Sequence, residues 1–372
     1  MKKILVFLVV TIVILLGLIT YGAITAKDRM TAFTPSEIPD CDRNKGVQVV
    51  TVQMRWDLEN YATPQGFARE IERLVTLGLE DVDRTKPVLF VFPEDVGAPL
   101  VFLNEYQNVK DKATLKDAIG AVILRNAPRV LYCSLRYWVG PVRALALSKA
   151  GLIGPVYMET FSQLARKYGV YIVAGSAPLP DFPLDQDAGV ISYKTHSKHV
   201  YNVSYFFGPD GRIIGRQKKV HLIPLEQSEG LDLTPGKLDE ISAVATPFGT
   251  VGIAVCFDAF HEDVLNALIT QGAEILVQPS ANPGPWNEWQ QKDWLNGAWK
   301  AVQEYPELRY AINPMMTGNL FDLGFAGQSS VITKAEWAKT GLSYPLAPVE
   351  GGFISLASGH DTEELLVTVL SE

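Results

Sequence analysis

Three side chains that could do chemistry together stand next to predicted strands. Glu94 and Cys256 each follow a short apolar run, and Lys219 ends a short basic run. Short continuous apolar runs are typical of buried strands, and a strand end presents its next side chain at the edge of a sheet. A carboxylate can serve as a base, a thiolate as a nucleophile and an ammonium group as a partner for developing negative charge. The three together predict a hydrolytic site.

Each of these residues also has a simpler interpretation when it is taken alone. Cysteine is among the most buried residue types, and most buried cysteines are inert. A lone lysine is usually a solvated surface charge, and a lone glutamate after a strand is commonly a helix cap or part of a surface ion pair. The combination of the three therefore carries the prediction.

Strands and helices that alternate along the chain must position these residues. Strands are predicted at 47–52, 88–92, 170–175, 203–207, 213–219, 250–256, 275–279, 310–313 and 329–333. Helices are predicted at 66–79, 156–168, 262–271 and 289–303. This alternation predicts an α/β layered domain. The Gly-Pro-Asp-Gly turn at 208–211 indicates a hairpin, so the sheet should be mixed.

The segment 95–154 interrupts this alternation, because its apolar and aromatic clusters are interspersed with arginines. Two interpretations remain open. The segment is either a packed insertion or subunit contact, or a lid that touches a membrane or binds a lipid-like substrate with its cationic and aromatic residues.

The first 26 residues differ from the rest. Lys2 and Lys3 precede an uncharged stretch, 4–26, that is long enough as a helix to cross a bilayer core of about 30 Å. Its length favours an uncleaved transmembrane anchor over a cleaved signal peptide. The polar segment 27–45 is then a linker, and 46–372 is the globular domain. The two lysines predict a cytoplasmic N-terminus and an extracytoplasmic domain.

Composition excludes several classes of protein. The 372 residues are 47% hydrophobic and 20% charged, which is typical of a globular chain. The net charge of −8 argues against a nucleic-acid-binding surface. Cys41, Cys133 and Cys256 are too few for a disulfide framework, although a Cys41–Cys133 bridge remains open. No cysteine or histidine spacing typical of zinc sites occurs, so no metal is predicted.

The order Phe92-Pro93-Glu94, Lys219-Val220-His221-Leu222 and Cys256-Phe257-Asp258 resembles the carbon-nitrogen hydrolase (nitrilase) superfamily, as do 278–282 and 327–330. The resemblance implies a four-layer α-β-β-α sandwich that commonly forms homodimers. It also implies a Glu-Lys-Cys triad that needs no cofactor. Glu94 would be the base, Cys256 the nucleophile that forms a thioester, and Lys219 the cation beside the oxyanion, aided by the Phe257 N–H.

Several positions depart from the family pattern. The second glutamate that many members carry beyond the lysine falls on Gln227 here, and we expect Glu226 to take its place. An arginine common after the cysteine is missing, and the segment after Glu94 is longer than usual. Trp286 is a candidate lining residue of the substrate pocket. His221 raises a rival hypothesis, a Cys–His thiol enzyme, although its more usual role would be to fix the lysine loop.

The predicted function is hydrolysis of a non-peptide carbon–nitrogen bond in a small amide or nitrile, an amide being favoured. The alternative is an N-acyltransferase that passes the same thioester-bound acyl group to an amine, for which the predicted anchor favours lipid-linked substrates. A third hypothesis is a binding module that keeps the fold without catalysis, and the complete set of three residues argues against it.

Overall fold

The computed structural model describes residues 46–185, 190–194 and 196–371, together with 30–32 and positions 11, 13 and 17. Apart from positions 11, 13 and 17, the predicted anchor lies outside the described residues, and so does most of the predicted linker. Within the described part, no helix is both long enough and apolar enough to cross a membrane. Strand β1 (Met30–Ala32) falls inside the predicted linker and pairs antiparallel with β7 (Val190–Ser192).

The larger of two main sheets holds ten strands, and its centre is parallel. There β2 (Val47–Arg55), β3 (Val88–Val91) and β4 (Tyr171–Val173) run in the same direction. The hairpin of β8 (Val200–Phe207) and β9 (Ile213–Lys218) is antiparallel, which confirms the mixed sheet. The other strands of this sheet are β5 (Ala177–Pro180), β13 (Ser280–Ala281), β15 (Met315–Leu320), β16 (Leu323–Phe325) and β19 (Glu364–Leu370).

The second main sheet has six strands in the order β10-β11-β12-β14-β17-β18. Its two parallel pairings, β11 to β12 and β12 to β14, lie at its centre. The strands are β10 (Ala243–Thr246), β11 (Gly249–Ile253), β12 (Ile275–Val277), β14 (Tyr310–Asn313), β17 (Ser330–Thr333) and β18 (Phe353–Leu356). A small separate sheet joins β6 (Leu184–Asp185) to β7.

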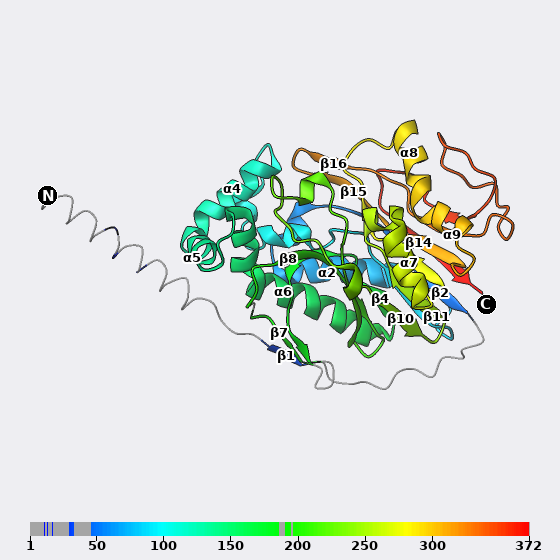
Figure 1. The fold of residues 1–372 in the computed structure, drawn as a ribbon, viewed down its shortest axis with the longest axis horizontal. Coiled ribbons are helices and arrows are strands. Elements are labelled where there is room, and N and C mark those ends of the chain that lie inside the picture. The colour runs from blue at the N-terminus through cyan, green and yellow to red at the C-terminus, as the bar shows by residue number, and fades with distance from the viewer. Residues whose placement is uncertain are drawn as a thin grey trace, which may run out of the picture.

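Side-chain alternation along the central strands builds the layers, because successive residues of a strand point to opposite faces. Val50 and Phe90 pack in one core with helices α2 (Pro64–Gly78) and α6 (Pro141–Tyr168). Their neighbours Val49 and Leu89 pack in a second core with the six-stranded sheet. Figure 1 shows α7 and α9 on the face of the six-stranded sheet that is turned away from the ten-stranded sheet. The elements there are α7 (Glu262–Thr270), α8 (Glu288–Trp294), the π-helix η7 (Leu295–Trp299) and α9 (Lys300–Glu304).

The segment predicted as an insertion is helical and has a core of its own. Its elements are η3 (Ala98–Phe102), α3 (Tyr106–Val109), α4 (Leu115–Arg125), α5 (Ala127–Tyr137) and the first half of α6. They gather at one end of the molecule (Figure 1) around a third cluster of buried apolar side chains, among them Val122, Val130 and Leu145. Cys133 lies in this cluster as a buried free thiol, and Cys41, its suggested partner, lies outside the described residues.

Helix α6 begins at Pro141, fifteen residues before the predicted start at 156. Proline is disfavoured inside helices, and Pro155 directly precedes the predicted start. The structure carries the helix through Pro155, whose neighbours Gly154 and Val156 are buried. Tertiary packing on both sides of the proline therefore outweighs its local cost.

Candidate active site

The turn after β3 places Glu94 in the interior. Asp95 follows with a positive φ of 61°, so the chain reverses sharply immediately after the glutamate. Ser176 holds this turn, because its Oγ accepts a hydrogen bond from the Asp95 N–H at 2.9 Å. Gly175 passes so close that a Cβ there would meet the Pro93 carbonyl oxygen at 2.0 Å. The Glu94 side chain is 2% exposed.

Lys219 lies between two buried carboxylates. Its Nζ is 2.8 Å from Glu94 Oε1 and 2.8 Å from Glu226 Oε2. Glu226 ends the short helix η4 (Pro224–Glu226), and its Oε2 also accepts from the Ile223 N–H, which fixes the carboxylate. The structure therefore brings Lys219, Glu94 and Glu226 together, although 125 residues separate the first two.

An amide joins the two carboxylates on another side. Nδ2 of Asn202, on β8, donates to Glu94 Oε1 at 2.9 Å and to Glu226 Oε1 at 2.8 Å. Glu94 Oε2 accepts a further hydrogen bond from the Ala281 N–H at 3.0 Å. With donors on both oxygens, the Glu94 carboxylate is held in one orientation.

Cys256 begins the short helix η6 (Cys256–Phe260), just after β11. Its φ of 49° is unusual for a residue with a side chain and costs of order 1–3 kcal/mol, a strain that concentrates at functional sites. The surrounding backbone is held: the Cys256 N–H donates to the Pro279 carbonyl at 2.8 Å, and Gln278 Nε2 donates to the Cys256 carbonyl at 3.1 Å. The thiol lies beside the Glu94 carboxylate and the Ala281 N–H, both of which shift its pKa.

Burial and mutual charge set the ionisation of this group. Burial raises the pKa of Glu94, and the charge of Lys219 only partly offsets this effect. Burial, reinforced by the charge of Glu94, raises the pKa of the Cys256 thiol well above its usual value. Burial by itself lowers the pKa of Lys219, but the charges of Glu94 and its neighbours outweigh burial and raise it. The resting state is therefore a neutral thiol beside a carboxyl group and a permanent cation.

Asp258 holds the loop that carries the lysine. Its carboxylate accepts from the Val220 N–H at 3.0 Å and from the His221 N–H at 2.7 Å, which are the two amides after Lys219. Burial raises the pKa of Asp258 to about 7, and the two N–H groups act against that shift. Because Asp258 belongs to η6, one short element carries the thiol and also sets the position of the ammonium group.

His221 has the structural role that was predicted for it, because it lies two residues after Lys219 and ties the lysine loop to its surroundings. Its Nε2 lies 3.0 Å from Asp263 Oδ1, and its ring stacks on His261 with centroids 3.7 Å apart. Among the side chains that shift the pKa of Cys256, Glu94 has the largest effect.

His221, His261 and Asp263 could in principle hold a metal ion, since one ligand atom from each lies within 4.8 Å of the others. The two rings are almost parallel, with 11° between their planes. Stacked rings direct their in-plane lone pairs side by side rather than toward one point. The tetrahedral arrangement that zinc prefers would require one ring to turn.

Phe257 and Trp286 occupy different surroundings. Phe257 follows Cys256 in the first turn of η6, where backbone N–H groups lack intrahelical partners, and its ring is 38% exposed. Trp286 is buried, and its Nε1 donates to Gln328 Oε1 at 3.0 Å. It packs edge-on against Trp294 and Tyr344 in the second core. A contact between Trp286 and substrate stays a prediction.

A groove of ≈ 370 Å³ adjoins these elements. Val220 and His221, which follow the lysine, and Phe257, which follows the cysteine, line it. The ion pair of Arg143 and Asp232, 2.7 Å apart, borders the groove. The groove is therefore lined by residues that adjoin Lys219 and Cys256 in the chain.

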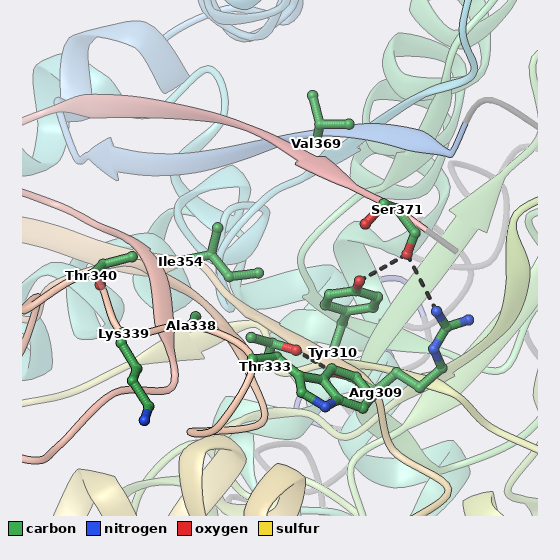
Figure 2. Close-up of a pocket in the computed structure, with 10 residues that line it drawn as sticks. Arg309, Tyr310, Thr333, Ala338, Lys339, Thr340, Ile354, Val369 and Ser371 are labelled. Atoms are coloured by element: carbon green, nitrogen blue, oxygen red, sulfur yellow. Dashed lines mark hydrogen bonds between the residues drawn. The ribbon is translucent and has the colours of Figure 1, made fainter.

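A larger hollow of ≈ 640 Å³ lies elsewhere, and Figure 2 shows its lining residues. Tyr310 and Arg309 both donate there to the Ser371 carbonyl oxygen, at 2.8 and 3.4 Å. None of the residues described above in the buried group lines this hollow. The large volume of this hollow is therefore no reason to assign it to the candidate active site.

Comparison with protein-family models shows which family the chain belongs to. The carbon-nitrogen hydrolase model matches residues 137–332, which is more than half of the chain. The chain belongs to the carbon-nitrogen hydrolase family. Curated relatives match over a shorter segment. Omega-amidase NIT2 of Xenopus tropicalis is 30% identical over 129 residues, and omega-amidase NIT3 of Saccharomyces cerevisiae is 26% identical over 130. These segments cover 33% of this chain and 41% and 40% of the relatives.

Solved structures show the same carbon-nitrogen hydrolase fold. A carbon-nitrogen hydrolase from Helicobacter pylori G27 has a TM-score of 0.53 at 19% identity, over 88% of this chain and 89% of that one. An amidase mutant from Nesterenkonia sp. AN1, with the acetamide moiety of fluoroacetamide added to its active-site cysteine, has a TM-score of 0.54 at 15% identity. That match covers 89% of this chain and 92% of the other.

Sequence reasoning missed Asn202 and the positioning role of Asp258. Asn202 lies on β8, one residue before the predicted strand at 203–207, and belongs to no motif. Its burial became apparent only because β8 begins at Val200, three residues before the predicted start; an asparagine within a buried strand is unusual, since such strands normally take apolar residues. Asp258 stood in the quoted Cys-Phe-Asp motif, but its two backbone partners lie 37 and 38 residues away in the chain.

Proposed function

We propose that this chain is an amidase that cleaves a carbon–nitrogen bond through a thioester on Cys256. One observation carries the proposal: a carboxyl group, an ammonium group and a thiol from three distant segments meet in the interior, beside a groove. Lys219 is 2.8 Å from Glu94, and the thiol lies beside Glu94. The names of the curated relatives, omega-amidases, support an amide as the substrate.

In the first half-reaction the Cys256 sulfur attacks the amide carbon while Glu94 takes the thiol proton. The carbonyl oxygen gains negative charge, which the Lys219 ammonium and the Phe257 N–H stabilise more in the transition state than in the ground state. The carbon–nitrogen bond then breaks. The proton on Glu94 passes to the leaving nitrogen, which departs as ammonia or an amine.

In the second half-reaction Glu94 accepts a proton from water, and the resulting nucleophile attacks the thioester carbon. The carbon–sulfur bond breaks, the carboxylic acid leaves, and the proton returns to the Cys256 sulfur. A carboxyl group with a raised pKa suits both steps, because a base works best when its pKa lies near the working pH. Glu226 does not exchange protons in this scheme; it fixes Lys219 from the other side.

Mass spectrometry of the intact protein with a simple primary amide tests the proposal. We expect the protein to gain the mass of the acyl group and to release ammonia, and we expect Cys256→Ala to do neither. Cys133→Ala is the matched control, because Cys133 is also a buried free thiol. An acyl adduct that persists in Cys256→Ala would overturn the assignment. Acyl transfer to an added amine in preference to water would identify the transferase instead.

A further inference from the structure

A narrow apolar chamber lies beside the Glu94 turn. Its volume is ≈ 80 Å³. A water-sized group needs about 10–15 Å³ of such space, so the chamber has room for roughly five to eight of them. The predicted insertion forms one wall, with Ile119 on α4 and Ala146 on α6. The β15–β16 hairpin forms another, with Leu320 and Phe325.

The two walls are fastened to each other. The Leu115 N–H at the start of α4 donates to Asp322 Oδ1 between β15 and β16, at 2.8 Å. Phe102 of η3 meets Phe321 of the same hairpin edge to face, with ring centroids 5.3 Å apart. The chamber is therefore preformed and keeps its shape without a ligand.

The chamber lies next to the carboxylates of the site along the chain. Asp95, directly after Glu94, and Leu225, directly before Glu226, both line it. Leu233 lines both the chamber and the groove beside Phe257. The chamber and the groove are thus neighbours, and both are lined by residues that adjoin the buried group in the chain.

The lining selects against charge. Among the described residues that line the chamber, Asp95 is the one ionisable side chain. Burial, together with the negative charge of Glu94, raises the pKa of Asp95 well above its usual value, which favours its uncharged form. A chamber without a cation cannot compensate a bound carboxylate, whereas it removes an alkyl chain from water at a gain.

We propose that this chamber binds the unbranched aliphatic acyl chain of the amide substrate. This inference rests on the proposed function, because it assigns the acyl half of the molecule that Cys256 attacks. That half must stay in place after the nitrogen leaves, until water arrives. The apolar chamber retains it, and the groove beside Phe257 lets the amine depart and water enter. The predicted insertion thereby sets the chain length.

Binding of primary amides to the full chain carrying Cys256→Ala tests the inference without turnover. Calorimetry would follow unbranched amides from acetamide to octanamide. We expect the Kd to fall about fourfold for each added methylene group. The gain should stop at roughly five to eight carbon atoms, where the chamber is full. An equal Kd for acetamide and hexanamide would overturn the inference.

A filled chamber gives the second measurement. Ala146→Phe places a phenyl ring in the space and should raise the Kd of hexanamide by about tenfold or more while leaving that of acetamide within about twofold. Ala127→Phe is the matched control, because Ala127 is exposed at the start of α5. An unchanged chain-length profile in Ala146→Phe would place the alkyl chain elsewhere. If Ala146→Phe does not fold, the amide series on the parent protein decides alone.

The two proposals fail separately. Chain-length-dependent binding without any acylation of Cys256 in the wild-type protein would refute the amidase and leave the chamber as an aliphatic binding site. Acylation by short and long amides at equal rates and affinities would keep the amidase and refute the chamber.

Discussion

Lys219 Nζ lies 2.8 Å from Glu94 Oε1, and both side chains are at most 3% exposed. The second carboxylate, Glu226, is equally close and equally buried. Two buried acids thus depend on one cation for compensation. Lys219 is a structural residue as much as a functional one.

Replacing Lys219 with alanine should therefore destabilise the protein as well as stop turnover. A broken buried ion pair costs about 3–5 kcal/mol, because the remaining charge has no partner. Urea unfolding measures this loss. Lys292→Ala is the control: in its ion pair with Glu288 the side chains are 61% and 63% exposed, so we expect a loss below about 1 kcal/mol. A wild-type unfolding free energy in Lys219→Ala would contradict the ionic interpretation.

Glu94→Gln should slow acylation of Cys256 by about 10²–10⁴-fold, the usual contribution of a general base. The amide keeps the shape of the side chain but cannot accept the thiol proton. Stopped-flow or quenched mass spectrometry measures the acylation rate. Glu70→Gln changes another buried glutamate, paired with Arg73 outside the site, and should leave that rate unchanged. Equal rates in Glu94→Gln and the wild type would assign the base elsewhere.

The pH dependence of kcat/KM should show an acidic limb that reports Glu94 in the free enzyme. Its protonated form cannot act as a base, so activity falls as pH drops through its pKa. Burial raises that pKa, and the midpoint should therefore lie above the ordinary value of about 4.3.

Asn202→Ala should move this limb further toward neutral pH. The Asn202 amide donates to the Glu94 carboxylate, and a donor to the charged form lowers a pKa. Asn126→Ala removes a comparable amide from Glu105 and should leave the midpoint in place. A shift of the limb toward acid in Asn202→Ala would show that the limb belongs to another group.

Asp258 should act through position and not through contact with substrate. Asp258→Ala removes the acceptor for the Val220 and His221 N–H groups, and we expect kcat to fall by about tenfold or more as Lys219 loses its place. Asp258→Asn keeps one acceptor oxygen and should recover part of the rate. If the asparagine and alanine variants are equally slow, the carboxylate charge matters instead.

The strands and the turn that bears Cys256 could be predicted from the sequence, because each depends on a continuous apolar run that is visible locally. The strand at 310–313 was predicted with the bounds that β14 has, and 213–219 differs from β9 by one residue. The three reactive side chains were also named from sequence, and the structure brings them together. Their roles remain proposals.

Features that depend on residues far away in the chain could not be predicted from the local sequence. Strand β19 carries the pattern Glu-Leu-Leu-Val-Thr-Val-Leu, yet only its pairing with β2 makes it part of the sheet. Asn202 owes its significance to two acids, one of them 108 residues away. The left-handed backbone of Cys256 is imposed by the Pro279 and Gln278 contacts, and nothing in the residue type suggests it.

The pairing of β2 with β19 also bears on how the domain is made. Residues 47–53, near the beginning of the domain, take their partners from 364–370. During synthesis β2 emerges from the ribosome long before that partner exists, and an unpaired strand edge invites aggregation. The nascent chain must shield this edge until residues 364–370 have left the ribosome, so the sheet cannot close before then.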